Sequence, residues 1–306
     1  MKKLISAEFD YSTKHIIYNI LGIRFHIRNK QTELFTYIDT VYSLLNNYLD
    51  ITKIKPATGE LRETQIECFE LLKVIKQILQ QHNFTYWLDS GTLLGAHRHK
   101  GFVPWDDDID ICMLRDDYEK ARNILKQYFA NSSFEVRERA KETNYFQIRV
   151  INKNKKGIGV DIFPIDFYCE NVILEREKEE IDNKIRKAKK IFDKKYSTKV
   201  LKSNKIQQAL MDLKKIQDKI VLENKKVLNN QNNSLFFGID FLYRPKHHLI
   251  MDNDIIFPLK TISFEGEEFS CPNQVQKYLT NLYGDYMSFP KSSKCIGNGE
   301  INIWEK

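Results

Sequence analysis

Apolar residues recur at helical spacing in two segments of the chain. Residues 62–81 place apolar side chains three and four positions apart, and so do residues 117–129. This period predicts two amphipathic helices, the second with Asp116 as its N-cap. The apolar faces are Cys68 or Phe69, Leu72, Ile75 and Leu79 in the first helix, and Tyr118, Ala121, Leu125 and Tyr128 in the second.

Short β-branched and aromatic runs predict strands. Four of them are "TYWL" at 85–88, "DIDICM" at 108–113, "YFQIRVI" at 145–151 and "GVDIFPI" at 159–165. Two hairpins are expected as well, at 15–29 around Gly22 and at 260–271 with Gly266 in the turn. A further helix is expected at about 274–287.

Strands and helices mix without regular alternation, which predicts an α+β fold, a mixed sheet with flanking helices. Residues 175–228 show a long helical pattern. We therefore divide the chain into an N-terminal extension with a short hairpin, 1–50, and a main domain, 51–306. A helical insertion at about 175–230 interrupts the main domain.

Composition supports a folded protein: 42% of the 306 residues are hydrophobic and 12% are aromatic, enough for a sizeable core. Five scattered cysteines without a CxxC pair argue against a zinc cluster or a disulfide scaffold and fit a reducing compartment. We see no signal-peptide pattern and no apolar run of membrane-spanning length. These features predict a cytoplasmic location.

Positive charge is concentrated in one segment. Residues 184–226 hold 15 Lys and Arg against 4 Asp and Glu; since the whole chain carries +7, the remainder carries −4. This distribution argues against a nucleic-acid-binding fold. The basic segment is either a solvated helical face or a contact site for an anionic membrane or glycolipid.

Acidic residues gather in "DSGTLLGAHRHKGFVPWDDDIDICM", residues 89–113. Side chains alternate along a strand, so Asp108 and Asp110 share one face while their aliphatic neighbours face the core. Asp161 has the same setting in the later strand, and it joins the pair if the two strands are neighbours. Asp106 shares the parity and is expected to orient the site from outside. Such carboxylates suit Mg²⁺ or Mn²⁺ and phosphoryl transfer.

Groups suited to an anion lie close to these acids. Ser90, Gly91 and Thr92 allow close backbone approach, and a helix that starts at Thr92 would direct its N–H groups at a phosphate. Positive side chains to neutralise a second phosphate are expected from Arg98, Lys100 or Arg149. Arg149 is opposite in parity to its aliphatic neighbours; it faces either the cleft or the surface.

Three aromatic residues near the acids leave two alternatives open. Trp105, Trp87 and Phe102 either pack in the core or line an aromatic cage for a quaternary ammonium group. The sequence does not choose between them.

The order strand, glycine turn, helix, basic cluster, acidic strand and second acidic strand is typical of the polymerase-β-like nucleotidyltransferase fold. "YWLDSGTLLGAHRHKGFVPWDDDIDICMLRDDYEK", "VDIFPID" and "YLTNLYGDYMSFP" closely resemble the LicD family, which includes fukutin and fukutin-related protein. The resemblance runs from about Cys68 to Pro290. The chain departs from the family pattern at His97, after Pro290 and in the length of its basic insertion.

The resemblance implies a nucleotidyltransferase-like enzyme that moves a phospho-alcohol from a CDP-activated donor to a glycan hydroxyl and releases CMP. It implies phosphocholine from CDP-choline as the first choice, and lipooligosaccharide, capsule or teichoic acid as the acceptor. By motif, Asp108, Asp110 and Asp161 would hold Mg²⁺, and Ser90, Gly91 and Thr92 would contact the donor. Ribitol, glycerol or ethanolamine donors, ordinary nucleotidyl transfer and a non-catalytic scaffold remain as alternatives.

Overall fold

The computed structural model describes residues 5–10, 15–20, 23–28, 31–141, 145–155, 157–168, 234–237 and 251–289. The helical insertion predicted at about 175–230, with its basic segment 184–226, lies outside the described residues.

A seven-stranded mixed sheet forms the centre of the molecule. Its strands are β4 (Tyr86–Leu88), β5 (Ile109–Leu114), β6 (Phe134–Lys141), β7 (Tyr145–Asn152), β8 (Gly159–Tyr168), β9 (Ser234–Phe237) and β10 (Met251–Asp252). β5 and β8 run parallel, and every other pair in the sheet is antiparallel. β7 pairs with the first part of β8 and β9 with its last part, which leaves the opposite edge of β8 to β5. The predicted α+β class with a mixed sheet is confirmed.

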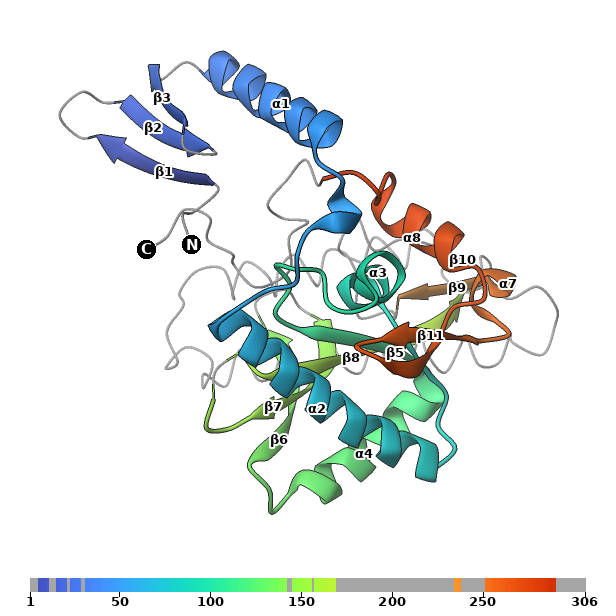
Figure 1. Cartoon of the computed structure of the whole chain (residues 1–306). Coiled ribbons are helices and arrows are strands. Elements are labelled where there is room, and N and C mark those ends of the chain that lie inside the picture. The colour runs from blue at the N-terminus through green and yellow to red at the C-terminus, as the bar shows by residue number, and fades with distance from the viewer. Residues whose placement is uncertain are drawn as a thin grey trace, which may run out of the picture.

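Helices pack on this sheet from both sides (Figure 1). α2 (Glu60–Gln81) and α4 (Arg115–Phe129) lie together on one side, and α3 (Ser90–His99) and α8 (Val275–Tyr283) lie towards the other. The remaining elements of this part are the 3₁₀ turn η1 (Ile51–Lys53), the short helix α7 (Asn253–Ile256) and the hairpin of β11 (Lys260–Phe264) and β12 (Glu267–Cys271).

A separate three-stranded antiparallel sheet precedes the long helix α1 (Gln31–Tyr48). It consists of β1 (Ile5–Asp10), β2 (His15–Ile20) and β3 (Ile23–Arg28). β2 and β3 are the hairpin that the sequence predicted at 15–29. In Figure 1 this sheet and α1 lie at one end of the molecule.

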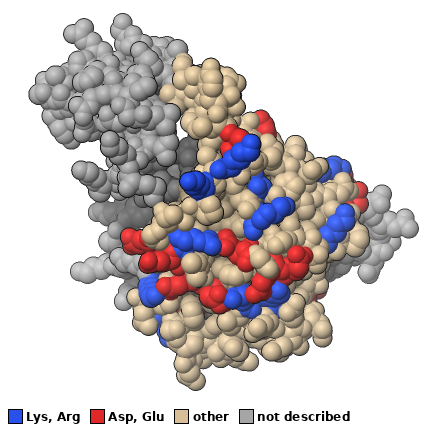
Figure 2. All heavy atoms as spheres, viewed as in Figure 1, with Lys and Arg blue, Asp and Glu red and all other residues tan. Residues whose placement is uncertain are grey.

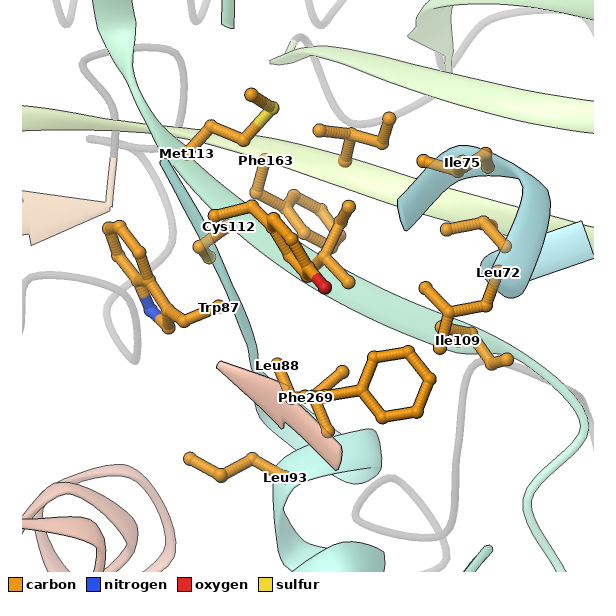
Figure 3. Close-up of a cluster of buried hydrophobic side chains, with 14 of the residues drawn as sticks. Leu72, Ile75, Trp87, Leu88, Leu93, Ile109, Cys112, Met113, Phe163 and Phe269 are labelled. Carbon is orange, nitrogen blue, oxygen red and sulfur yellow. The ribbon is translucent and has the colours of Figure 1, made fainter. Parts of the chain in front are cut away.

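The core is built from the faces that the apolar pattern defined. Leu72 and Ile75 of α2 meet Ile109 of β5 and Phe163 of β8 in one buried cluster (Figure 3). Trp87 of β4 lies in the same cluster and is fully buried. Burying such side chains stabilises the fold by about 1.5–3 kcal/mol each relative to exposure.

Details of three predicted helices were wrong. Asp116 lies in the first turn of α4, whose N-cap is Leu114. Tyr128 is 59% exposed and Phe129 takes its place in the core, because a spacing of four from Leu125 continues the buried stripe. The last helix ends at Tyr283, since Gly284 adopts a positive φ of 70°. α3 begins at Ser90 rather than at Thr92.

Charged groups of both signs mix over the molecular face that carries α2 (Figure 2). Ion pairs such as Lys73 with Glu70 and Lys155 with Glu67 account for part of this pattern. Within the described residues, none of the helices combines the length and the apolar character that crossing a membrane requires.

Candidate active site

Three adjacent strands align the central charged residues. Asp110 of β5 lies beside Asp161 of β8 in the parallel register, and Asp161 lies opposite Arg149 of β7 in the antiparallel register. Residues directly opposite each other project from the same face of a sheet. Arg149 Nη1 therefore reaches Asp161 Oδ2 at 3.1 Å. Of the two positions that the sequence left open for Arg149, the structure shows the one facing the acids.

Asp108 completes an acidic cluster with Asp110 and Asp161. One oxygen from each of the three carboxylates lies within 4.8 Å of the others. All three residues are buried, with 5%, 7% and 1% of their surfaces exposed. Asp108 also belongs to a second cluster, with Asp106 and Asp107. The sequence predicted that Asp161 would join Asp108 and Asp110 if their two strands were neighbours. β5 and β8 are neighbours, and the three carboxylates lie together.

The electrostatics of this cluster favour an added cation. Burial, followed by the charges of Asp161 and Asp107, raises the pKa of Asp108 to about 7. Burial and neighbouring carboxylates likewise raise the pKa of Asp110 well above its ordinary value. Burial lowers the pKa of Arg149, but the acids around it outweigh that effect and raise its pKa overall. One guanidinium thus faces several carboxylates whose ionisation is suppressed by burial and, after it, by mutual repulsion.

The donor set fits a hard divalent ion. Asp110 Oδ1 is buried and has no hydrogen-bond partner in the described part of the chain. A buried carboxylate oxygen without a partner is costly unless something else binds it. Three carboxylates at this spacing offer the all-oxygen ligands that Mg²⁺ and Mn²⁺ prefer. Asp108, Asp110 and Asp161 are the residues that would hold the ion.

The start of α3 packs directly against the acidic cluster. Thr92 Oγ1 accepts the backbone N–H of Asp110 at 2.8 Å, so this hydroxyl fixes the strand that carries the acid. A Cβ at Gly91 would collide with the carboxylate of Asp106, so only glycine permits this approach. Ser90 is half-buried and adopts a positive φ of 46° at the first position of the helix. The predicted donor-binding turn therefore lies beside the predicted metal ligands.

Asp89 and Tyr278 are two buried residues of this region that the sequence reasoning missed. Asp89 is fully buried, and it accepts hydrogen bonds from the hydroxyls of Tyr278 and of Ser90, the latter at 2.9 Å. Burial raises the pKa of Asp89 despite these bonds. The bonds tie α8 to the first residue of α3. The only signal in the sequence was an acid placed between an apolar strand and a Ser-Gly turn.

Arg98 and Lys100 make their hydrogen bonds, within the described residues, to groups other than the acids. Arg98 is largely buried; its Nη1 donates to the carbonyl oxygen of Tyr286 at 2.5 Å, and its guanidinium lies 5.9 Å from the ring centre of Trp105. Burial lowers the pKa of Arg98 to about 10. Lys100 is exposed and ends α3 with a left-handed φ of 60°. Of the three predicted phosphate-binding cations, Arg149 is the one that pairs with a carboxylate of the cluster.

The aromatic candidates differ in burial. Trp87 is fully buried against Phe257, and Phe102 is 5% exposed and packs on Phe264. Of the two alternatives that the sequence left open for Trp87 and Phe102, core packing or an aromatic cage, the structure shows core packing. Trp105 is half-buried and stacks on Phe289, with a distance of 6.4 Å between ring centres.

Comparison with known proteins identifies relatives of the chain. Residues 83–199 match the family model described as LicD/FKTN/FKRP, nucleotidyltransferase domain. The lipopolysaccharide cholinephosphotransferase LicD of Haemophilus influenzae is 29% identical over 265 residues, which covers 75% of this chain and 92% of that protein. Human ribitol 5-phosphate transferase FKRP is 29% identical over 111 residues, 35% of this chain and 22% of that protein.

A solved structure of terminal uridylyl transferase 4 from Trypanosoma brucei with bound GTP also matches, with a TM-score of 0.23 and 16% identity. It covers 50% of this chain and 47% of that chain. A score this low supports no conclusion about the chain. The family-model match at residues 83–199 spans the elements from β4 to β8, which carry the acidic cluster. Residues 83–199 of the chain are therefore similar to the nucleotidyltransferase domain that LicD, FKTN and FKRP share.

Proposed function

We propose that the protein transfers phosphocholine from CDP-choline to a hydroxyl of a cell-surface glycan, in a reaction that depends on Mg²⁺. Lipooligosaccharide, capsule and teichoic acid are the acceptors we consider. The observation that carries the proposal is the buried cluster of Asp108, Asp110 and Asp161, which lies within residues 83–199, the segment that matches the family model. The similarity of the chain to a lipopolysaccharide cholinephosphotransferase supports choline as the alcohol.

In the proposed reaction, the acceptor hydroxyl attacks the phosphorus that carries choline. A new bond forms between the glycan oxygen and that phosphorus, and the bond from the phosphorus to the CMP oxygen breaks. The hydroxyl loses its proton, and CMP leaves with the electron pair of the broken bond. A divalent ion would neutralise negative charge on the diphosphate.

The chain's own residues have three tasks in this proposal. Asp108 and Asp110 hold the ion, and Asp161 either completes its ligands or accepts the proton of the attacking hydroxyl. Arg149 adds positive charge at the same face, 3.1 Å from Asp161. Ser90 and Gly91 position the diphosphate at the start of α3, where unpaired helical N–H groups favour an anion.

A second candidate is transfer of another phospho-alcohol, such as ribitol, glycerol or ethanolamine phosphate, from its CDP donor. The similarity to a ribitol 5-phosphate transferase supports this class of reaction. The burial of Trp87 and Phe102 removes two of three cage candidates, which weakens the case for choline specifically. Trp105 is the remaining aromatic candidate near the acids.

A donor panel tests both candidates. The purified protein is incubated with Mg²⁺, a glycan acceptor from cell envelopes and each of CDP-choline, CDP-ribitol, CDP-glycerol and CDP-ethanolamine, and CMP release is followed. We expect acceptor-dependent CMP release with CDP-choline and none with the Asp110→Asn variant. Release from another donor alone would replace phosphocholine with that alcohol, and acceptor-independent turnover would contradict glycan transfer.

A further inference from the structure

Asp108 is the one residue of the three-acid cluster that no strand contains. Asp110 lies within β5 and Asp161 within β8, paired in register, whereas β5 begins only at Ile109. Asp108 therefore belongs to the loop of residues 100–108, between α3 and β5. The position of its carboxylate depends on the groups that fix this loop.

Gln65 of α2 holds the end of the loop nearest to Asp108. Its side chain is fully buried, and its Nε2 donates to the carbonyl oxygens of Asp106 at 2.8 Å and of Val103 at 3.4 Å. The N–H of Asp106 donates to Val103 at 2.9 Å. One amide group thus binds both ends of the tight turn that precedes Asp108.

Glu265 holds the beginning of the loop from the other side. It lies at the tip of the β11–β12 hairpin, and its Oε1 accepts the N–H of Phe102 at 3.1 Å. Its own backbone N–H donates to the carbonyl oxygen of Lys100 at 3.0 Å. A Cβ at Gly101 would collide with Oε1, so glycine makes this approach possible.

Arg62 connects these two holding groups. It binds Glu265 through two parallel hydrogen bonds, Nη1 to Oε1 at 3.0 Å and Nη2 to Oε2 at 2.6 Å. Its Nη1 also donates to Gln65 Oε1 at 3.2 Å, which directs the amide nitrogen of Gln65 towards the loop. A bidentate pair of this kind fixes geometry as well as contributing energy.

The backbone at the hairpin tip indicates that Glu265 is there for its side chain. Glu265 has a φ of 50° and Gly266 a φ of 83°. Positive φ at both central residues of a two-residue turn is typical of type I′, where asparagine, aspartate or glycine is usual at the first position. Glutamate there costs conformational energy, and strain of this kind persists where the surrounding contacts over-determine it.

We infer that Arg62, Gln65 and Glu265 form a positioning clamp, which holds the loop of residues 100–108 so that Asp108 can bind the ion together with Asp110 and Asp161. The inference rests on the proposed metal-dependent function. Gln65 binds the carbonyl oxygen of Asp106, two residues before Asp108, so the clamp fixes the backbone from which the Asp108 carboxylate projects.

Mn²⁺ binding to the purified full chain tests the clamp, with the free ion measured by electron paramagnetic resonance. We expect Glu265→Ala to weaken binding by about 10–100-fold, the range typical of groups that orient metal ligands. Glu265→Gln keeps an acceptor for the Phe102 N–H but removes the charged pair with Arg62, so the decrease in Mn²⁺ affinity should be smaller than in Glu265→Ala. Circular dichroism shows whether each variant is folded. If Glu265→Ala does not fold, the Mn²⁺ affinity of Glu265→Gln decides the test.

Glu267→Ala is the matched control. Glu267 lies on the same hairpin as Glu265. It pairs with Lys73 at 3.9 Å and Lys76 at 3.5 Å, both on α2, the helix that also carries Arg62. Within the described residues, the Glu267 side chain joins the hairpin to α2 and makes no hydrogen bond to the loop of residues 100–108. Its removal should therefore leave Mn²⁺ affinity within about twofold of wild type, since exposed pairs contribute little.

Two measurements separate the clamp from the metal site. A folded Glu265 variant with wild-type Mn²⁺ affinity would overturn the clamp and leave the proposed function intact. Wild-type protein that binds no Mn²⁺ would overturn the proposed metal site. In that case hydrogen exchange of the backbone amides still tests the clamp. The clamp predicts faster exchange at residues 101–108 in Glu265→Ala than in Glu267→Ala, and equal exchange in the two variants would refute it.

Discussion

Replacing Arg149 with methionine should destabilise the protein strongly in the absence of divalent ions. The Arg149 side chain is 12% exposed and its partner Asp161 is 1% exposed. Methionine keeps much of the apolar stem but removes the positive charge that faces the acidic cluster. Breaking a buried ion pair by removing one partner typically costs about 3–5 kcal/mol, because the remaining charge is left uncompensated.

The opposite change has the opposite sign. Asp110→Asn removes one negative charge from the same cluster and supplies an N–H donor to its neighbours. Burial and repulsion already raise the pKa of Asp110, so the neutral amide should raise the stability of the metal-free protein. It should also abolish metal binding and raise the barrier of the transfer reaction by several kcal/mol.

Urea unfolding with EDTA and with Mg²⁺ measures both effects. We expect Arg149→Met to unfold at lower urea than wild type in EDTA and to recover part of the difference in Mg²⁺, whereas Asp110→Asn should gain nothing from Mg²⁺. The reasoning would be refuted by an Arg149→Met protein as stable as wild type in EDTA. An Asp110→Asn protein that Mg²⁺ stabilises as much as wild type would refute the metal assignment.

Three further changes test other parts of the structure. Thr92→Val leaves the buried N–H of Asp110 without its partner and should cost about 1–3 kcal/mol in urea unfolding, whereas Thr92→Ser, which keeps the hydroxyl, should cost less. Gly159→Ala places a Cβ 2.7 Å from Arg149 Nε and should destabilise by about 1–3 kcal/mol; a cost that persists undiminished in an Arg149→Ala background would show that the two residues are not coupled. The basic segment, residues 184–226, should bind anionic but not neutral liposomes, less so at high salt. A variant with the five lysines of 187–195 changed to Gln should lose this binding; equal sedimentation on both lipids would leave the segment a solvated face.

Local pattern predicted most of the elements that carry the site. Ile109 and Ile111 alternate with Asp110, and Val160 and Ile162 flank Asp161, so each strand and the face of its acid could be predicted from period alone. The helical stripe of Leu72 and its neighbours was predicted on the same basis. These predictions succeeded because apolar burial and backbone period act over a few residues.

Strand order and the supporting contacts could not be predicted in this way. Nothing in the sequence near β5 says that β8 is its parallel neighbour or that β7 pairs on the other edge of β8. Tyr278 and Asp89 are 189 residues apart in the chain, and Arg62 and Glu265 are 203 apart. Such contacts depend on how the whole chain closes on itself.

The sequence alone showed which residues are acidic, which face of its strand Asp110 or Asp161 occupies and which family the motifs resemble. Tertiary packing was needed to show that Asp110, Asp161 and Arg149 form one row and that Trp87 belongs to the core. It was also needed to show that Glu265, 163 positions after Phe102, holds the loop that carries Asp108. The physical reason is that period and polarity are local properties, whereas register, burial and ion pairing across the sheet are set by the packing of distant segments.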